Sequence, residues 1–235
     1  MTFKAVLFDF SGTLFRIEPA TSWLSAALAQ TGVDMSSEEL RRCAMRLAVA
    51  GALPGGQPPE RVPADLADVW SARDESAALH RAAFTGLARR VDLPEPLYDA
   101  LYERHMAPAA WRPYADTAEV LGGLRRAGIA VGVVSNIGWD LRPVFRAHGM
   151  DHLVDAFVLS FEHGIQKPDA RLFQTACDEL GQDPHDVLMV GDSREMDGGA
   201  AALGCEVFFV DHLPVQERPS GLRPVLALAG LGALS

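Results

Sequence analysis

Short apolar runs that stop at polar residues constrain the fold of this chain most strongly. Residues 5–8 read Ala-Val-Leu-Phe and stop at Asp9, and similar runs occupy residues 129–134, 156–159, 187–190 and 207–210. Segments with helical spacing lie between them, at residues 117–127, 139–148, 170–180 and 196–203. Strands buried on both faces that alternate with helices form a parallel sheet. The sequence therefore predicts an α/β fold.

Residues 17–112 follow a different pattern, without short apolar strand runs. This stretch is rich in Ala, Leu and Arg, and a Pro-rich segment at 54–63 divides it. Its apolar residues recur at helical spacing: Trp23, Leu24, Ala27 and Leu28, and later Leu79, Ala82, Ala83 and Leu87. We expect a helical insertion at 17–112 in a core formed by residues 1–16 and 113–235.

Charge and composition exclude several classes of protein. The 235 residues carry a formal net charge of −10, which disfavours nucleic-acid binding because phosphate backbones repel such a surface. The widely spaced Cys43, Cys177 and Cys205 fit neither a disulfide framework nor a structural zinc site. No leader is evident and no apolar run reaches the roughly 18 residues of a membrane span. We expect a cytoplasmic protein that contacts no membrane; its oligomeric state is not encoded in any pattern.

Polar residues follow the predicted strands, where open α/β sheets bind their ligands. Asp9 precedes a Ser11-Gly12-Thr13 turn, and a tight glycine turn offers backbone amides to an anion. A carboxylate in this position can act as a nucleophile and form an aspartyl-phosphate. Ser135 and Asn136 place a hydroxyl and an amide at a second strand end. An ordinary turn after a strand would explain Asp9 with its glycine turn, or Ser135 with Asn136, nearly as well. These residues therefore indicate an active site only when they are taken together.

A lysine and an acidic segment complete the set of polar candidates. Lys167 is one of only two lysines, with Lys4, in a chain that otherwise uses arginine. A compact ammonium suits a site that holds one carboxylate and one phosphate oxygen. Asp192 and Asp197 follow another strand, and carboxylates that converge on one point need a cation. Mg²⁺ prefers such oxygen ligands.

Four strings in this order resemble the four motifs of the haloacid dehalogenase-like superfamily: FDFSGTL, VVSN, GIQKPD and VGDSREMD. The resemblance covers essentially the whole chain outside the helical insertion. It implies a Rossmann-like core and identifies the insertion as a cap of the type placed after the first strand. Such caps close over the site, exclude water and select a small-molecule substrate, here one that we expect to be phosphorylated.

The resemblance also implies a role for each motif residue. Asp9 is similar to the nucleophile, and Lys167 neutralises charge between Asp9 and the transferring group. Asp197 holds metal-bound water or orients Lys167. The implied substrate-binding residues are Thr13, Ser135 and Asn136. The implied Mg²⁺ ligands are Asp9, Asp192, Asp197 and the backbone carbonyl of Ser11.

Ser11 departs from the pattern, because phosphatases of the superfamily carry a second Asp there as the catalytic acid and base. A serine hydroxyl is a poor proton donor, and general acid–base help is worth roughly 10²–10⁴-fold in rate. The enzyme could be a phosphatase that is slow or takes its proton from the cap, where His80 and His105 are the candidates. It could act on acyl phosphates or anhydrides, which need no acid, or it could transfer a different group.

Other chemistries of the superfamily remain as alternatives. Dehalogenases also lack this Asp, but they usually carry an aromatic residue there and need no metal, whereas the Asp192 to Asp197 segment is intact here. Phosphonatases need a cap lysine, and residues 17–112 contain none. We therefore predict a Mg²⁺-dependent phosphatase with a catalytic Asp9, and keep a metal-independent 2-haloacid dehalogenase and a catalytically impaired binding protein as alternatives. For the tryptophans of the insertion we expect core packing rather than a place in the substrate pocket: Trp23, Trp70 and Trp111.

Overall fold

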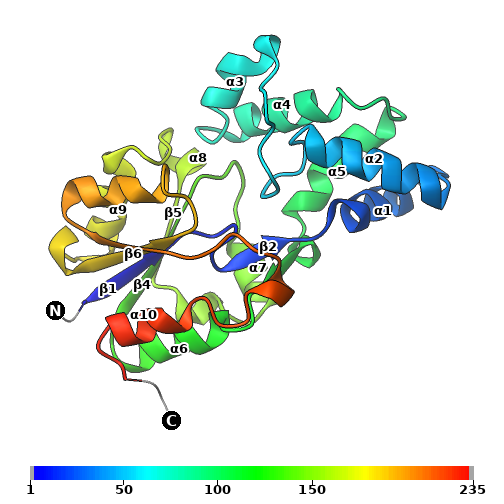
Figure 1. Cartoon of the computed structure of the whole chain (residues 1–235). Helices are drawn as coiled ribbons and strands as arrows, with labels where there is room; N and C mark the ends of the chain where they lie inside the picture. The colour runs from blue at the N-terminus through cyan, green and yellow to red at the C-terminus, as the bar shows by residue number, and fades with distance from the viewer. Residues whose placement is uncertain (1–2, 233–235) are drawn as a thin grey trace.

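A five-stranded parallel sheet forms the centre of the molecule, which a computed structural model describes over residues 3–232 (Figure 1). The strand order is β5-β4-β1-β6-β7, and every neighbouring pair is parallel. The strands are β1 (Ala5–Phe8), β4 (Ala130–Ser135), β5 (Ala156–Leu159), β6 (Val187–Gly191) and β7 (Glu206–Phe209). Each lies on one of the five apolar runs, so the predicted α/β fold is confirmed.

Both faces of the sheet are buried, which explains why its strands read as continuous apolar runs. Val6 and Phe8 of β1 belong to one hydrophobic cluster, and Ala5 and Leu7 belong to another, as the two-residue period of a strand requires. The first cluster is covered by α6 (Thr117–Arg126), α7 (Arg142–Ala147) and α10 (Arg223–Leu228). The second is covered by α9 (Ala170–Leu180), which contacts β4 and β5.

Two expected helices differ from the structure. The helix expected at residues 139–148 is only α7, which has Pro143 in its first turn, where a missing N–H costs little. The apolar spacing before it comes from Trp139 and Leu141, which are buried in the core rather than on a helix. The helix expected at 196–203 is a 3-10 helix, η5 (Asp197–Leu203), whose sequence carries two adjacent glycines. Glycine is a poor α-helix former because it loses the most backbone entropy.

Residues 18–110, as the structure describes them, contain helices and loops but no β-strand. The chain leaves the core through β2 (Phe15–Ile17) and returns through β3 (Trp111–Pro113), which pair as an antiparallel ribbon. The helices between them form the separate body beside the sheet in Figure 1. They are α1 (Ala20–Thr31), α2 (Ser37–Val49), η1 (Ala64–Leu66), α3 (Ala67–Ser71), α4 (Ala77–Ala88), α5 (Pro96–Met106) and η2 (Pro108–Ala110). We refer to residues 18–110 as the cap; the expected boundaries at 17 and 112 fall within the ribbon and stay a prediction.

The remaining short elements connect the core strands. They are η3 (Asp151–Leu153), α8 (Ser160–His163), η4 (Pro184–Asp186) and η6 (Val215–Glu217). All three cysteines are buried free thiols. Among residues 3–232, no helix combines the length and the apolar character that crossing a membrane requires.

Candidate active site

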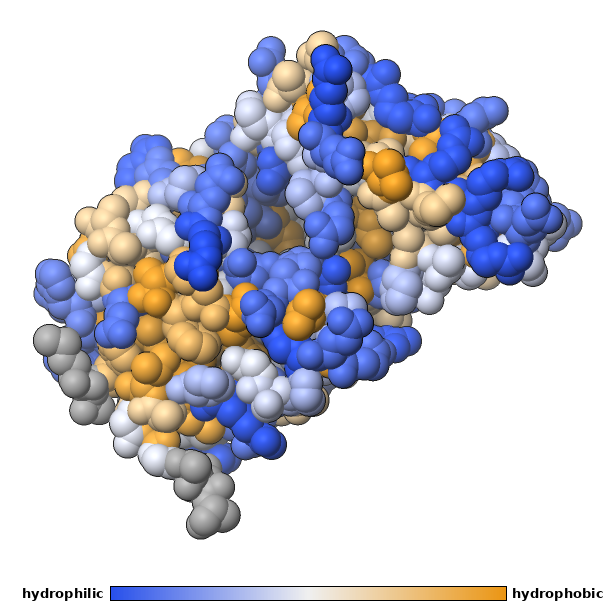
Figure 2. Space-filling model, viewed as in Figure 1, coloured by the Kyte–Doolittle hydropathy of each residue, from blue (hydrophilic) through white to orange (hydrophobic). Residues whose placement is uncertain are grey.

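The strand order brings the polar strand ends together. Asp9 follows β1, Ser135 ends β4 and Asp192 follows β6, and β1 lies between the other two strands. Because the strands are parallel, their carboxyl ends meet at one edge of the sheet. A cavity of about 510 Å³ opens there between core and cap, and Figure 2 shows the hollow. The motif residues that line it are Asp9, Ser11, Ser135, Asn136, Lys167, Asp192 and Asp197.

Lys167 links two of the carboxylates. Its Nζ donates to Oδ1 of Asp9 at 2.7 Å and to Oδ1 of Asp197 at 2.6 Å, and its side chain is only 2% exposed. Asn136 fixes the backbone of this lysine: its Nδ2 donates to the Lys167 carbonyl at 2.9 Å, and its Oδ1 accepts from the Lys167 amide at 2.7 Å. These two hydrogen bonds position Lys167 through its backbone.

Burial and charge set the protonation of this group. Burial raises the pKa of Asp9 to about 7; Lys167 opposes the shift, and the nearby Asp197 and Asp192 add to it. Burial alone would lower the pKa of Lys167, but Asp197 and Asp9 outweigh it and raise that pKa above its ordinary value. Lys167 therefore stays an ammonium, while Asp9 needs further positive charge to ionise fully at neutral pH.

The carboxylates of Asp9, Asp192 and Asp197 fit a divalent cation. Each can offer an oxygen such that the three atoms lie within 4.8 Å of one another. Lys167 supplies one positive charge against three carboxylates, and the all-oxygen donor set is the one that Mg²⁺ prefers. Asp192 is paired with Nδ1 of His212, a residue that the sequence did not point to. The three carboxylates are therefore suitable ligands for Mg²⁺, and His212 contacts one of them.

Ser11 and Thr13 occupy different surroundings although they share a turn. Ser11 lines the cavity, and its Oγ is a buried atom without a hydrogen-bond partner among the described residues. A Cβ at Gly55 of the cap would lie 2.8 Å from that oxygen, so the cap packs directly over it. Thr13 is fully buried and is not among the residues that line the cavity; its carbonyl accepts from Nη2 of Arg218.

Gly12 makes the close approach in this turn possible. Its φ of +87° lies in the region that side chains disfavour. A Cβ at this position would also run into the His212 ring and the Asp192 carboxylate. The glycine therefore lets the turn after β1 pack against the residues that follow β6 and β7.

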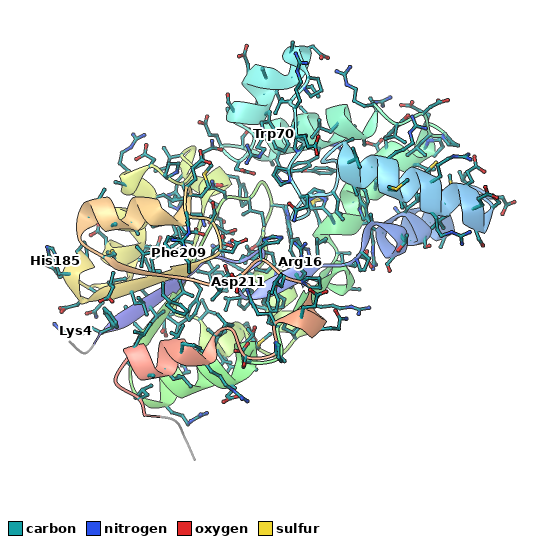
Figure 3. All side chains as sticks on the ribbon, in the orientation of Figure 1. Lys4, Arg16, Trp70, His185, Phe209 and Asp211 are labelled. Atoms are coloured by element: carbon teal, nitrogen blue, oxygen red, sulfur yellow. The ribbon has the colours of Figure 1, made fainter. Side chains whose placement is uncertain are left out.

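The cap contributes one wall of the cavity. Trp70, Arg73, Asp74, His80 and Phe84 line it, and in Figure 3 Trp70 lies on the cap, above Arg16 and Asp211 on the core side. Arg73 stacks on Trp70, with its guanidinium carbon 4.2 Å from the ring centroid. A single sequence gives no signal for Arg73 and Asp74, because they meet the core only when the cap docks.

The two candidate proton donors of the cap are placed differently. His80 lines the cavity, and burial holds its pKa well below the ordinary value. His105 is completely buried behind it, with ring centroids 5.4 Å apart, and is not among the lining residues. Burial lowers the pKa of His105 to about 3, with the bond to the Tyr102 carbonyl opposing the shift. The geometry therefore favours His80 over His105 as a group that reaches substrate.

The tryptophans of the insertion are divided between the cap interior and the cavity. Trp23 packs inside the cap, where its Nε1 donates to the Leu101 carbonyl at 2.8 Å. Trp70 and Trp111 line the cavity, although Trp111 is also part of the main hydrophobic cluster. Trp139 of the core joins them. Core packing therefore describes Trp23, whereas Trp111 and the partly buried Trp70 pack in or against the main cluster and also line the cavity.

Comparisons with known proteins agree with this architecture. A profile described as haloacid dehalogenase-like hydrolase matches residues 3–204. An (S)-2-haloacid dehalogenase of a Pseudomonas species is 34% identical over 63% of this chain and 62% of its own. A phosphoglycolate phosphatase of Nitrosospira multiformis is 28% identical over 89% of this chain and 83% of its own.

Two solved structures share the fold along nearly the full chain. A dehalogenase crystal structure aligns with a TM-score of 0.66 and 24% identity, covering 96% of both chains. The magnesium-bound HAD hydrolase YfnB of Bacillus subtilis aligns with a TM-score of 0.69 and 14% identity, covering 98% of this chain and all of that one. At such identities the likeness is one of fold.

The chain belongs to the haloacid dehalogenase-like hydrolases. The resemblance seen in the four motifs is thereby confirmed. The matches to the first two dehalogenases span only 62% and 57% of those relatives. Relatives of this chain include both 2-haloacid dehalogenases and phosphatases, so family membership alone does not identify the reaction or the substrate.

Proposed function

We propose that this protein is a Mg²⁺-dependent phosphohydrolase that acts on a small phosphorylated metabolite through an aspartyl-phosphate at Asp9. The observation that carries the proposal is the acidic group of Asp9, Asp192 and Asp197 with Lys167 inserted between two of its members. Dehalogenases of this superfamily need no metal, so three converging carboxylates serve a cation-dependent phosphoryl transfer better.

Each residue has a part in this reaction that its contacts support. Asp9 attacks phosphorus, and Lys167 offsets the negative charge that gathers between Asp9 and the phosphoryl group. Ser135 is 2% exposed at the end of β4 and offers a hydroxyl to a phosphoryl oxygen. Asp192 and Asp197, with Asp9, would hold Mg²⁺, which supplies electrostatic stabilisation of the transferring group.

The cavity sets the size and character of the substrate. Its volume of about 510 Å³ is in the range of sites that bind small metabolites. Trp70, Trp111 and Trp139 offer apolar surface, and Arg73 offers a positive charge on the cap side. We expect a phosphate ester or anhydride whose remaining part is small and partly apolar.

A second candidate function is 2-haloacid dehalogenation at Asp9 without metal. The alignments with two (S)-2-haloacid dehalogenases at 34% and 33% identity favour it. The absence of an Asp at Ser11 agrees with it, since dehalogenation needs no acid at that position. The acidic group is the observation against it, because without a cation Lys167 would have to offset three converging carboxylates.

The test is release of phosphate from acetyl phosphate and 4-nitrophenyl phosphate, with Mg²⁺ or with a chelator. The proposal expects Mg²⁺-dependent release that Asp9→Asn abolishes. In parallel, halide release from 2-chloropropionate is measured with a chelator. Halide release that depends on Asp9, together with no phosphate release from any substrate, would establish the second candidate. If neither product forms across a broad panel of phosphate esters, anhydrides and 2-haloacids, a catalytically impaired binding protein becomes the favoured alternative.

A further inference from the structure

Asp74 is a buried carboxylate on the cap side of the cavity that the motif residues do not account for. It is 4% exposed and lines the same cavity as Asp9 and Lys167. Within residues 3–232 no hydrogen bond reaches its carboxylate. The nearest cationic or imidazole nitrogens are Nε of Arg73, at 3.4 Å from Oδ2, and Nε2 of His80, at 3.9 Å from Oδ1. Buried carboxylates are usually hydrogen-bonded, so one that has no hydrogen-bond partner needs an explanation. Because Asp74 lies in the substrate cavity, a role in binding or catalysis is one such explanation.

The core holds the backbone of Asp74 in place. Oγ of Ser160, which follows β5, donates to the Asp74 carbonyl at 2.5 Å. The side chain of Gln166 accepts from the Asp74 amide at 3.3 Å and donates to the Ser71 carbonyl at 2.6 Å. Gln166 immediately precedes Lys167, so the loop that carries the catalytic lysine also carries the anchor for this cap segment. Asp74 is therefore positioned relative to the reacting groups and not only to the cap.

The side chain of His80 is held beside Asp74 by contacts with the cap and with the core. Its Nδ1 is 2.9 Å from the hydroxyl of Tyr102. Its side chain packs so closely against Gly138, in the loop after Ser135, that a Cβ there would collide with the imidazole. Nε2 is thus the ring nitrogen that faces Asp74.

Burial and the nearby charges act on Asp74 in opposite directions. Burial raises the pKa of Asp74, and the nearby Arg73 and Lys167 oppose that shift without reversing it. Burial lowers the pKa of His80, helped by His105 and Arg73. Tyr102, whose pKa burial raises to about 12, stays neutral. Burial thus makes the Asp74 carboxyl easier to protonate than an exposed one, and it disfavours the charged form of His80.

We propose that Asp74 is the proton donor to the leaving group, in the part that Ser11 cannot fill. This inference rests on the proposed phosphohydrolase function. Asp9 forms a bond to phosphorus, the bond from phosphorus to the bridging oxygen breaks, and that oxygen takes the proton of Asp74. In the second step the Asp74 carboxylate takes a proton from water while the water oxygen attacks phosphorus. Phosphate leaves, Asp9 is again a carboxylate and Asp74 is again protonated.

The test compares leaving groups. With Mg²⁺, Asp74→Asn should slow the single-turnover release of glycerol from glycerol 3-phosphate, an alkyl ester, by roughly 10²–10⁴-fold. It should slow the single-turnover release of acetate from acetyl phosphate much less, because that leaving group needs no proton, whereas the later hydrolysis of the aspartyl-phosphate slows for both substrates. A retained burst of acetate also shows that the variant is folded. Glu75→Gln, which removes the neighbouring carboxylate, should leave both rates unchanged.

Two further readouts separate a proton donor from a structural residue. In the wild type, kcat on glycerol 3-phosphate should fall as pH rises and Asp74 loses its proton. In Asp74→Asn this decrease of kcat with pH should be absent. Adding Ser11→Asp to Asp74→Asn should restore most of the alkyl activity. Equal losses in the rate of leaving-group release from both substrates in the first turnover, or a change in KM alone, would overturn the proposal.

The outcome for Asp9 keeps the two proposals apart. If Asp9→Asn abolishes phosphate release while Asp74→Asn has no preference among leaving groups, only the inference on Asp74 fails. If the wild type releases no phosphate from any substrate with Mg²⁺, the proposed function fails and the inference on Asp74 fails with it.

Discussion

Nζ of Lys167 lies 2.7 Å from Oδ1 of Asp9, and this contact joins two residues that are 158 positions apart in the chain. The same ammonium reaches Asp197 at 2.6 Å, so one buried cation balances carboxylates from two different strand ends. Removing either partner of such a buried pair leaves an uncompensated charge. The stability of the site and its chemistry therefore depend on the same atoms.

Lys167→Met should lower both activity and stability. Loss of the ammonium leaves Asp9 and Asp197 unpaired, and breaking a buried pair in this way costs about 3–5 kcal/mol. Urea unfolding without Mg²⁺ measures the loss, and adding Mg²⁺ should recover part of it. Lys4→Met is the matched control, because Lys4 is the only other lysine and pairs with Asp186 at the surface, far from the site (Figure 3). If Lys4→Met and Lys167→Met cost the same, the buried pair is not important for stability.

Ser11→Asp should raise activity on alkyl phosphates by more than on acyl phosphates. The substitution supplies a carboxyl at the position where phosphatases of the family carry their acid. The gain should be small beside an intact Asp74, and in the Asp74→Asn background it should approach the roughly 10²–10⁴-fold worth of general acid catalysis for poor leaving groups. Initial rates on glycerol 3-phosphate and acetyl phosphate measure the effect. Equal gains on the two substrates would contradict the leaving-group explanation of Ser11.

Gly12→Ala should damage the metal site before it unfolds the protein. The φ of +87° makes any side chain costly, by about 1–2 kcal/mol. The added Cβ would push against Asp192 and His212, so a ligand of the proposed Mg²⁺ has to move. We expect the Mg²⁺ concentration for half-maximal activity to rise at least about tenfold, as lost ligand alignment typically does. Gly128→Ala, which also has a positive φ but open space around its Cβ, controls for backbone strain. An unchanged Mg²⁺ requirement in Gly12→Ala would argue against Asp192 as a ligand.

Buried His105 should make the cap sensitive to acid. Its pKa is about 3 in the folded chain against an ordinary 6.5. Between these values only the unfolded chain takes up the proton, so folding stability falls as pH drops from about 6.5 towards 3. His105→Phe should remove about 2–3 kcal/mol of the stability lost between neutral pH and about pH 4.5. Urea unfolding at both pH values tests this, with the exposed His152→Phe as control. An identical pH dependence in His105→Phe and the wild type would contradict it.

The core of the site could be predicted from the sequence because it follows local rules. Each motif residue stands next to an apolar strand, and parallel strands bring their carboxyl ends together whatever the details of packing. Asp9, Ser135 and Asp192 accordingly lie at one edge of the sheet and line one cavity. The contact between Asn136 and the Lys167 backbone was not foreseen, since it depends on how two loops fold against each other.

The cap side of the site could not be predicted, because it depends on docking. Asp74 lies in the turn between α3 and α4 with no distinctive neighbours in sequence, and hydrogen bonds from Ser160 and Gln166 of the core hold its backbone at the cavity. His212 is hidden for a similar reason, as it meets Asp192 across the sheet edge. Long-range contacts of this kind leave no periodic signal in a single sequence.

Mg²⁺ dependence of phosphate release at Asp9 tests the central claim most directly. Wild type and Asp9→Asn are assayed side by side on acetyl phosphate, with Mg²⁺ and with a chelator, and halide release from 2-chloropropionate is followed in the same preparations. The proposed function predicts phosphate release by the wild type with Mg²⁺ only, none by Asp9→Asn, and no halide. Halide release that persists in chelator and disappears in Asp9→Asn, with no phosphate release, would contradict it.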